Sequence, residues 1–344
     1  MVGLNLNFGK FKARSRAAGA AVLSSVVVTS LDIPPSEYDA ITGSCGMVDR
    51  SERGKLALTG ADAKSFLQGQ VSNDIEALRP GIGCYATFLT PKGKMLGDLR
   101  ALDTGNELLL DTERVALQEL FNMIRRFSVG YDVEVHKRTL QRGLLSLLGP
   151  TADQVAGTAQ LPATEHAHAA IEVGGASVRA VRTDLGVDLF CDAGDTDTLA
   201  QTLERAGAEP VSETVADCVR VEGGRPRYGI DLDDTMIPQE ADLNARAVSF
   251  TKGCYVGQET VARLYYRGKP NRQLRGLRLS GPAWTGAEIA FGGRVVGRLG
   301  SVATSPNLGQ IALALVRREA PPGSHVTVGS DEIKAVVVEL PFAR

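Results

Sequence analysis

The segment 252–259 carries several kinds of reactive or hydrogen-bonding side chain within a short stretch. It reads Lys-Gly-Cys-Tyr-Val-Gly-Gln-Glu, so an ammonium, a thiol, an amide and a carboxylate follow one another closely. Glycine lacks a Cβ and accepts positive φ angles, so Gly253 and Gly257 predict a shaped loop that presents the Cys254 sulfur. In an extended backbone Lys252 and Cys254 would project to the same side, where an ammonium favours the nucleophilic, metal-binding thiolate. The alternative is a buried cysteine that serves as a small hydrophobic residue.

The other cysteines and the histidines show no pattern of a metal or redox site. The chain has 5 cysteines and 4 histidines, and no two cysteines have the spacing of a zinc or redox motif. An odd number of widely separated thiols indicates a reducing compartment, and we expect all cysteines except Cys254 to pack as small hydrophobic residues. His166 and His168 lie in an alanine-rich polar segment, which is more typical of an exposed loop than of metal ligands. We therefore predict no preformed metal site.

Length and composition are those of an ordinary folded protein. The chain has 344 residues, 43% of them hydrophobic and 23% charged, which suggests two or three domains with a sizeable core. Its formal net charge of −2 gives no overall reason to expect binding to nucleic acid or membranes. No Gly-x-Gly-x-x-Gly sequence lies between a strand and a helix and no phosphate-binding loop occurs, so we expect no dinucleotide or ATP site.

A basic stretch with two tyrosines follows the segment 252–259. Its members are Arg263, Tyr265, Tyr266, Arg267, Lys269, Arg272, Arg275 and Arg278. Basic residues interleaved with aromatic ones can bind RNA. On a loop that leads into a strand, however, they more often form a solvated face or contact an acidic ligand tail. We therefore expect no direct binding of nucleic acid.

The first two thirds of the chain predict short strands mixed with helices. Residues 83–89 and 95–102 predict two paired strands, because the Pro-Lys-Gly sequence between them is typical of a hairpin turn. Alternation predicts further strands over 54–60, 108–110, 131–136, 143–148, 176–182 and 187–191. Helical spacing of apolar residues predicts helices over 38–45, 62–68, 113–127 and 195–206. Strands that follow one another closely indicate an α+β fold with antiparallel sheets.

After residue 273 the pattern changes to short alternating strands separated by turns. Strands are predicted over 274–279, 294–299, 311–317, 325–328 and 333–340. Turn signals recur at Gly281-Pro282, Gly292-Gly293 and Pro321-Pro322-Gly323. Short strands at regular spacing predict a small β-barrel at this end of the chain.

The first 35 residues differ from the rest. Basic residues precede any acidic one and are followed by a small apolar run, a pattern that fits a secretory signal or an organellar transit peptide. Ser24 and Ser25 interrupt the apolar run, which is also too short to span a membrane. We favour a flexible extension of a cytoplasmic protein, with an organellar location as the alternative if residues 1–35 are a transit peptide.

The segment 252–259 resembles the hallmark of the YgfZ-type folate-binding proteins, relatives of the glycine-cleavage T-protein (aminomethyltransferase) whose mitochondrial cousins assist iron–sulfur cluster maturation. Residues 260–263 and 266–268 continue the likeness, and residues 220–224 and 238–240 resemble a stretch shared with T-proteins. The resemblance implies a T-protein-like folate-binding region over 38–250, in two intertwined subdomains. A signature loop and connector over 251–272 and a barrel over 273–344 would follow, and an extension over 1–37 would precede it.

The resemblance also implies that the ligand is tetrahydrofolate or a derivative. A pterin ring has a donor edge that suits a carboxylate, and its glutamate tail suits arginine or lysine. The residues expected to bind it are Lys92, Asp98, Arg220, Glu222, Tyr228, Gln258 and Glu259, with Arg100 and Arg227 as further candidates. For Arg220 and Glu222 the alternative is a structural ion pair at a domain interface.

Departures from the T-protein pattern bear on the activity. Where an aminomethyltransferase carries two consecutive acids, this chain has Gly97-Asp98. We therefore expect an accessory protein that binds folate and supports iron–sulfur cluster assembly or repair, with Cys254 and Lys252 as its reactive residues. Its partners would be iron–sulfur client or assembly proteins, including cluster enzymes of tRNA modification. The alternative is an aminomethyltransferase-like one-carbon transferase in which Asp98 stabilises developing charge and Cys254 is incidental.

Overall fold

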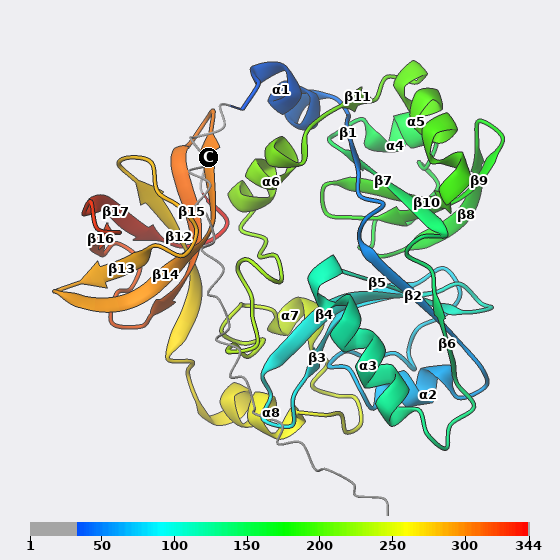
Figure 1. The fold of residues 1–344 in the computed structure, drawn as a ribbon, viewed down its shortest axis with the longest axis horizontal. Coiled ribbons are helices and arrows are strands. Elements are labelled where there is room, and N and C mark those ends of the chain that lie inside the picture. Colours follow the sequence, from blue (N-terminus) through cyan, green and yellow to red (C-terminus); the bar gives the residue numbers. More distant parts are fainter. Residues whose placement is uncertain (1–32, 343–344) are drawn as a thin grey trace, which may run out of the picture.

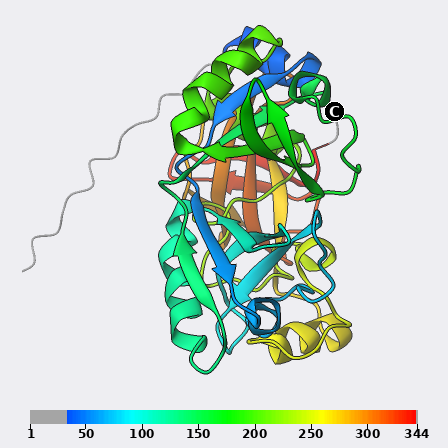
Figure 2. The ribbon, with the colours of Figure 1, turned by 90° about the vertical axis from the view of Figure 1, so that its right-hand side faces the viewer.

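Two β-sheets and a closed β-barrel make up the fold (Figure 1). The computed structural model describes residues 33–342, so most of the N-terminal extension lies outside the described residues. Viewed from the side, the barrel lies behind the two sheets (Figure 2). The expected α+β architecture with a C-terminal barrel is confirmed.

The first sheet has the strand order β3-β4-β5-β2-β6 and is antiparallel throughout. Its strands are β2 (Gly54–Thr59), β3 (Gly83–Leu89), β4 (Met95–Asp103), β5 (Leu108–Thr112) and β6 (Glu134–Lys137). Helices α2 (Ala63–Gln68) and α3 (Leu117–Phe127), the latter entered through the 3-10 turn η1 (Arg114–Ala116), cover one face. Apolar side chains such as Phe66, Leu99 and Leu120 are buried between this face and the helices.

The second sheet has the order β11-β1-β7-β10-β9-β8. Its strands are β1 (Gly46–Asp49), β7 (Arg142–Leu148), β8 (His168–Val173), β9 (Ala176–Arg182), β10 (Gly186–Asp192) and β11 (Glu209–Pro210). Helices α1 (Pro35–Gly43), α4 (Ala152–Ala156) and α5 (Thr196–Arg205), the last after η2 (Ala193–Asp195), lie around it (Figure 1). The chain enters this sheet with β1, leaves to build the first sheet, and returns with β7.

The barrel closes in the order β12-β15-β14-β13-β16-β17. Its strands are β12 (Arg272–Leu279), β13 (Glu288–Phe291), β14 (Arg294–Ser305), β15 (Gly309–Arg317), β16 (His325–Val328) and β17 (Ile333–Val338). The sequence pattern did not indicate β13, because it is only a few residues long and ends at the Gly292-Gly293 turn. Helix α6 (Glu213–Glu222) packs against β14 and β15 and so joins the barrel to the second sheet.

A largely irregular segment runs from α6 to the barrel and packs on the β3–β4 hairpin. It contains α7 (Asn244–Ala247) and α8 (Gln258–Arg267). Gly257 has φ 86°, and a Cβ there would lie 2.6 Å from the carbonyl oxygen of Thr90, so glycine is required at this close approach. The tyrosines and Arg263 and Arg267 of the basic stretch lie on helix α8 and not on the expected loop.

The two histidines of the alanine-rich segment correct a sequence-based expectation. His166 is 7% exposed and His168 3% exposed, so neither lies on an exposed loop. His168 opens strand β8, and His166 has φ 68° just before it. No group of potential metal ligands forms within residues 33–342. Burial between the sheets, which local composition does not reveal, decided their position.

Candidate functional site

A cavity of about 190 Å³ lies where the two sheets meet the end of α6 and the loop that follows it. Strands β3 and β4 contribute Tyr85, Asp98 and Arg100 to its wall, while α6 and the next loop contribute Arg220, Arg227 and Tyr228. Arginines dominate the lining, and each described one is paired with a carboxylate. We call this space the central cavity.

Asp98 is a buried carboxyl group in the wall of the central cavity. It is 6% exposed, and the Tyr85 hydroxyl donates a hydrogen bond of 2.6 Å to its Oδ2. Strand pairing explains the contact. Tyr85 lies opposite Arg100 in the β3–β4 ladder, which makes it the diagonal neighbour of Asp98, two residues along β4 on the same face. Burial raises the pKa of Asp98 to about 6, although the Tyr85 hydrogen bond opposes the shift. Asp98 can therefore change protonation close to neutral pH.

A buried ion-pair network lies beside Asp98. Asp111 on β5 is fully buried and accepts hydrogen bonds from Arg53 (2.9 Å) and Arg100 (2.8 Å). Arg100 also donates to Asp188 on β10 at 2.6 Å, and so connects the two sheets. Burial alone would raise the pKa of Asp111, but the guanidinium groups of Arg100 and Arg53 outweigh it and hold the pKa well below its ordinary value. These charges fix the wall of the cavity.

Arg220 and Arg227 reach the cavity from α6 and the loop behind it. Arg220 donates to Asp217 (2.8 Å) and Asp231 (3.0 Å), and its Nη2 donates to Ser301 of the barrel at 2.6 Å. Arg220 therefore forms an ion pair at the interface with the barrel, as in the alternative considered from the sequence, and it also lines the cavity. Arg227 donates to Glu213 at 2.5 Å. Tyr228 follows on the same wall, and burial raises its pKa to about 12.

Glu222 lies outside the central cavity, which corrects its expected role at the ligand. It is 3% exposed and accepts hydrogen bonds from Tyr38 (2.9 Å) and Ser305 (2.5 Å). Those partners belong to α1 and the barrel, so its carboxylate fastens three elements together. The other acids of the cavity lining come from other strands and loops: Glu113, Glu165, Asp184 and Asp188.

Lys252 has a structural contact that the sequence did not predict. Its side chain is buried, and Nζ donates to the backbone carbonyl oxygens of Gln68 (2.5 Å), Val71 (2.7 Å) and Asn73 (2.9 Å). An ammonium has three N–H donors, so these contacts use all of them. Burial lowers the pKa of Lys252 to about 8, which leaves it mostly charged at neutral pH. Lys252 therefore pins the signature loop to the segment after α2.

Cys254 is exposed, as the flanking glycines predict. The segment is bent, so Lys252 turns inward while Cys254 faces outward, and the two do not share a side as they would in an extended backbone. Gln258 and Glu259 open helix α8. Lys92 is exposed at the β3–β4 turn. The central cavity is lined by none of these surface residues: Lys92, Cys254, Gln258 and Glu259. The structure thus separates the predicted residues into a cavity group and a surface group.

Three wall residues that the sequence did not indicate carry buried polar atoms. His166 Nδ1, Thr183 Oγ1 and Arg246 Nε all lack a hydrogen-bond partner in the described part of the chain. Burial, with the nearby charges of Arg100 and Arg246, lowers the pKa of His166 to about 3, so its ring is neutral. Buried polar groups are nearly always paired, which makes such atoms candidates for ligand contacts. None of these three residues has a local signal that marks it as part of the site. Tyr85, a further wall residue, could have been found from the predicted pairing of its strand with β4.

These features define what the central cavity can bind. A carboxyl group, a neutral imidazole, a threonine hydroxyl and a guanidinium offer both donors and acceptors to a planar, polar ring. The arginines of the lining suit an anionic tail, because guanidinium pairs with carboxylate through two parallel hydrogen bonds. No helix within residues 33–342 is long and apolar enough to cross a membrane.

Two protein-family models match the chain. That of the GCVT N-terminal domain covers residues 30–252, and that of the glycine cleavage T-protein C-terminal barrel domain covers residues 272–343. The chain is 31% identical over 339 residues to a putative chloroplastic transferase, At1g60990, of Arabidopsis thaliana (94% of this chain, 77% of the relative). It is 29% identical over 321 residues to an aminomethyltransferase of Rubrobacter xylanophilus (90% and 86%).

Among solved structures, the chain resembles the glycine cleavage system aminomethyltransferase T from Bartonella henselae. The TM-score is 0.79 at 23% identity, and the match covers 90% of this chain and 89% of that one. At this identity the likeness establishes a shared fold.

Proposed function

The chain belongs to the glycine cleavage T-protein family, and from that premise we propose that it binds tetrahydrofolate or a derivative in the central cavity. One observation carries the proposal: buried polar atoms of His166, Thr183 and Arg246 lack partners beside the buried carboxyl group of Asp98. A pterin ring, with donors and acceptors along its edges, supplies partners of both kinds. Asp98 and Tyr85 would meet the ring, and Tyr228 would pack near it.

The size of the cavity limits how much of a folate it can hold. Its volume of about 190 Å³ is below the range of roughly 300–1,000 Å³ typical of pockets for drug-sized ligands. It therefore suits one bicyclic ring, with the glutamate tail extending toward the rim. Arg220 and Arg227, predicted from the sequence as folate ligands, lie on the wall that the tail would pass.

We further propose that this folate-binding protein is an accessory protein of the YgfZ type, which supports iron–sulfur cluster assembly or repair. The exposed thiol of Cys254 and the signature segment 252–259 support this role. Clusters are held by several cysteine thiolates, so Cys254 would act together with a partner, such as a cluster enzyme of tRNA modification. Gly97 also argues against a transferase, because a Cβ there would lie 2.5 Å from the Phe88 ring. A second acid next to Asp98 would not fit without repacking.

The second candidate is a tetrahydrofolate-dependent transfer of a one-carbon unit, as in aminomethyltransferases. Asp98 favours it, because a buried carboxylate that can ionise near neutral pH is suited to stabilise positive charge on a folate nitrogen. The names of the Rubrobacter and Arabidopsis relatives, an aminomethyltransferase and a putative transferase, point the same way. In this case Cys254 would be dispensable.

We place the protein in the cytoplasm as a proposal. The Arabidopsis relative, whose name describes it as chloroplastic, supports the organellar alternative in which residues 1–35 are a transit peptide. Fluorescent fusions of the full chain and of a chain that starts at residue 36 would separate the two. Removing a transit peptide would move the protein out of the organelle, whereas removing a flexible extension would leave its location unchanged.

We predict that folate affinity depends on the protonation of Asp98. The ionised carboxylate accepts a hydrogen bond from a folate N–H, so binding of tetrahydrofolate should be full above pH 6 and weaken as pH falls through about 6. Asp98→Asn should weaken binding about tenfold or more at pH 7.5 and remove the pH dependence. Anaerobic calorimetric titration of both proteins at several pH values measures this. The same transition in Asp98→Asn, or in neither protein, would contradict the assignment.

A second prediction separates the two candidate functions. Cys254→Ala should bind tetrahydrofolate with wild-type affinity, because Cys254 does not line the central cavity. In cells that depend on the protein, the same variant should lose the activity of iron–sulfur enzymes if the accessory role is right. Cluster-enzyme activity at the wild-type level would remove that role and leave the transferase reading. Glu288→Gln, on an exposed barrel strand, is the control for folding and expression.

A further inference from the structure

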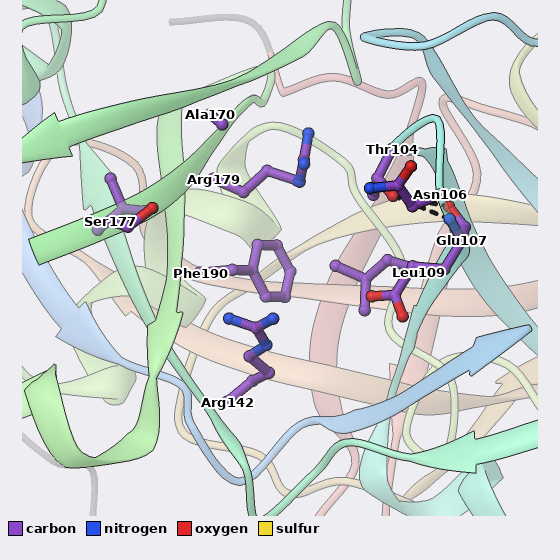
Figure 3. Close-up of a pocket in the computed structure, with 10 residues that line it drawn as sticks. Thr104, Asn106, Glu107, Leu109, Arg142, Ala170, Ser177, Arg179 and Phe190 are labelled. Atoms are coloured by element: carbon purple, nitrogen blue, oxygen red, sulfur yellow. Dashed lines mark hydrogen bonds between the residues drawn. The ribbon is translucent and has the colours of Figure 1, made fainter.

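Figure 3 shows a second cavity, whose volume is about 330 Å³. Strands β7, β9 and β10 form one side, and β5 with the β4–β5 turn forms the other. Phe190 lines this second cavity and Arg100 lines the central one, and the Arg100 guanidinium lies 5.8 Å from the centre of the Phe190 ring. The two cavities are therefore neighbours on either side of this contact.

Arg179 lines the second cavity and has no carboxylate in direct contact within the described part of the chain. No carboxylate of residues 33–342 lies within ion-pair distance of its guanidinium, although its side chain is partly buried. Its Nη1 lies 2.9 Å from Nδ1 of His168, which burial and Arg179 itself keep neutral by lowering its pKa to about 4. Partly buried arginines are normally paired, because an isolated charge loses hydration without compensation. An anion in the cavity would supply the missing partner.

Arg142 brings a second guanidinium to the same space. Figure 3 shows Arg142 and Arg179 on opposite sides of the Phe190 ring, with Leu109 facing them. Arg142 donates to Asp192 at 2.6 Å through Nη1 alone, so its other donors remain available. Burial lowers the pKa of Arg179; the charge of Glu107 opposes this shift in part, and the charge of Arg142 adds to it. Two cations beside an aromatic ring suit an anion attached to a planar or apolar body.

The acidic residue in the wall, Glu107, offsets only part of this charge. Glu107 lies at the β4–β5 turn and pairs with Arg138 at 3.3 Å. Its carboxylate would accept a hydrogen bond from an N–H of a ligand and would repel a second carboxylate placed close to it. The ligand is therefore expected to have its carboxylate at the arginine side and a neutral or N–H-bearing portion toward Glu107.

We propose that the second cavity is a binding site for an organic carboxylate with an aromatic or apolar body. Its volume lies within the range of pockets that hold small molecules. The carboxylate would pair with Arg179 and Arg142, while Phe190 and Leu109 contact the body. Such a carboxylate could be a separate small acid, or the aminobenzoyl-glutamate tail of a folate bound in the neighbouring cavity. The second source depends on the proposed folate binding, and the first does not.

The test uses 4-aminobenzoylglutamate as the probe, an aromatic ring that bears carboxylates and an N–H group. Calorimetric titration should show saturable binding to the wild-type protein, and binding about tenfold or more weaker to Arg179→Gln. Arg298→Gln, which removes an exposed arginine of the barrel, is the matched control and should bind like wild type. No binding by wild type, or equal binding by Arg179→Gln and wild type, would overturn the proposal.

A stability measurement excludes a merely structural role for Arg179. Glutamine keeps an N–H that can donate to Nδ1 of His168, so Arg179→Gln should unfold at close to the wild-type temperature. A clear decrease in the unfolding temperature together with loss of probe binding would assign Arg179 a structural role and overturn the proposal.

The two sources of the carboxylate give different results with tetrahydrofolate. If the site receives a folate tail, Arg179→Gln weakens folate binding and saturating folate blocks the probe. If the site takes a separate acid, Arg179→Gln leaves folate affinity unchanged and the probe still binds in saturating folate. Should the protein bind no folate at all, the proposed function fails, while the probe result with Arg179→Gln still decides the carboxylate site.

Discussion

Replacing Asp111 by asparagine lowers the free energy of unfolding by about 3–5 kcal/mol, the cost of removing one partner from a buried ion pair. Asp111 is fully buried and accepts hydrogen bonds from both Arg53 and Arg100. An asparagine has nearly the same shape, so the loss reflects charge and not packing. The two guanidinium groups are left with less compensating charge between the sheets. Chemical denaturation followed by circular dichroism measures the difference.

The pH dependence of this effect has a definite sign. The folded pKa of Asp111 lies below its ordinary value of 3.8, so its stabilisation is fully present above that value and is lost as pH falls below it. The difference between wild type and Asp111→Asn should therefore be constant at neutral pH and shrink on acidification. Glu288→Gln breaks an exposed ion pair with Arg298 and should cost less than about 1 kcal/mol. Equal effects of Asp111→Asn and Glu288→Gln would disprove the assigned role.

Lys252→Met has the second large effect, and it should be strongest in the signature loop. The variant leaves the carbonyl oxygens of Gln68, Val71 and Asn73 without the Nζ donor. An unsatisfied buried polar group costs about 1–3 kcal/mol, and water can reach some of these carbonyls once the loop loosens. We expect a loss of about 3 kcal/mol in unfolding free energy. Hydrogen exchange of residues 249–257 should accelerate more than exchange in the barrel.

Two comparisons give the Lys252 prediction its meaning. Lys92→Met removes an exposed lysine from the neighbouring hairpin turn and should leave both stability and exchange close to wild type. Labelling of Cys254 by a thiol reagent reports the state of the loop directly. If Lys252 acted mainly by stabilising the thiolate, Lys252→Met would slow labelling without changing stability, which is the opposite of the pattern expected here.

Much of the fold could be predicted from local sequence patterns. The β3–β4 hairpin, helices α2, α3 and α5, and most barrel strands follow from alternation, helical spacing and turn residues, which depend on neighbours in the chain. Strand β13 was missed because a strand of a few residues has too short a pattern. The burial of His166 and His168 was missed because their surroundings come from other strands.

The sequence by itself indicated the glycine cleavage T-protein family, through the resemblance of residues 220–224, 238–240 and 252–259, and the exposure of Cys254, through the glycines beside it. Asp98 could also be chosen from the sequence, because it is the remaining acid at a position where T-proteins carry two. The family and the choice of Asp98 rest on resemblance within short stretches of the chain, and the exposure of Cys254 rests on local backbone geometry.

The tertiary structure alone decided which residues share a cavity. Residues as far apart as Asp98, His166 and Arg246 meet because the chain leaves the second sheet, builds the first and returns. Alternation tells which side chains share a face of a strand, but not which other element covers that face. The same holds for three other side chains. Glu222 lies at the barrel interface, Lys252 donates to buried carbonyl oxygens, and Arg179 lines the second cavity. Long-range packing, which no short pattern encodes, made these choices.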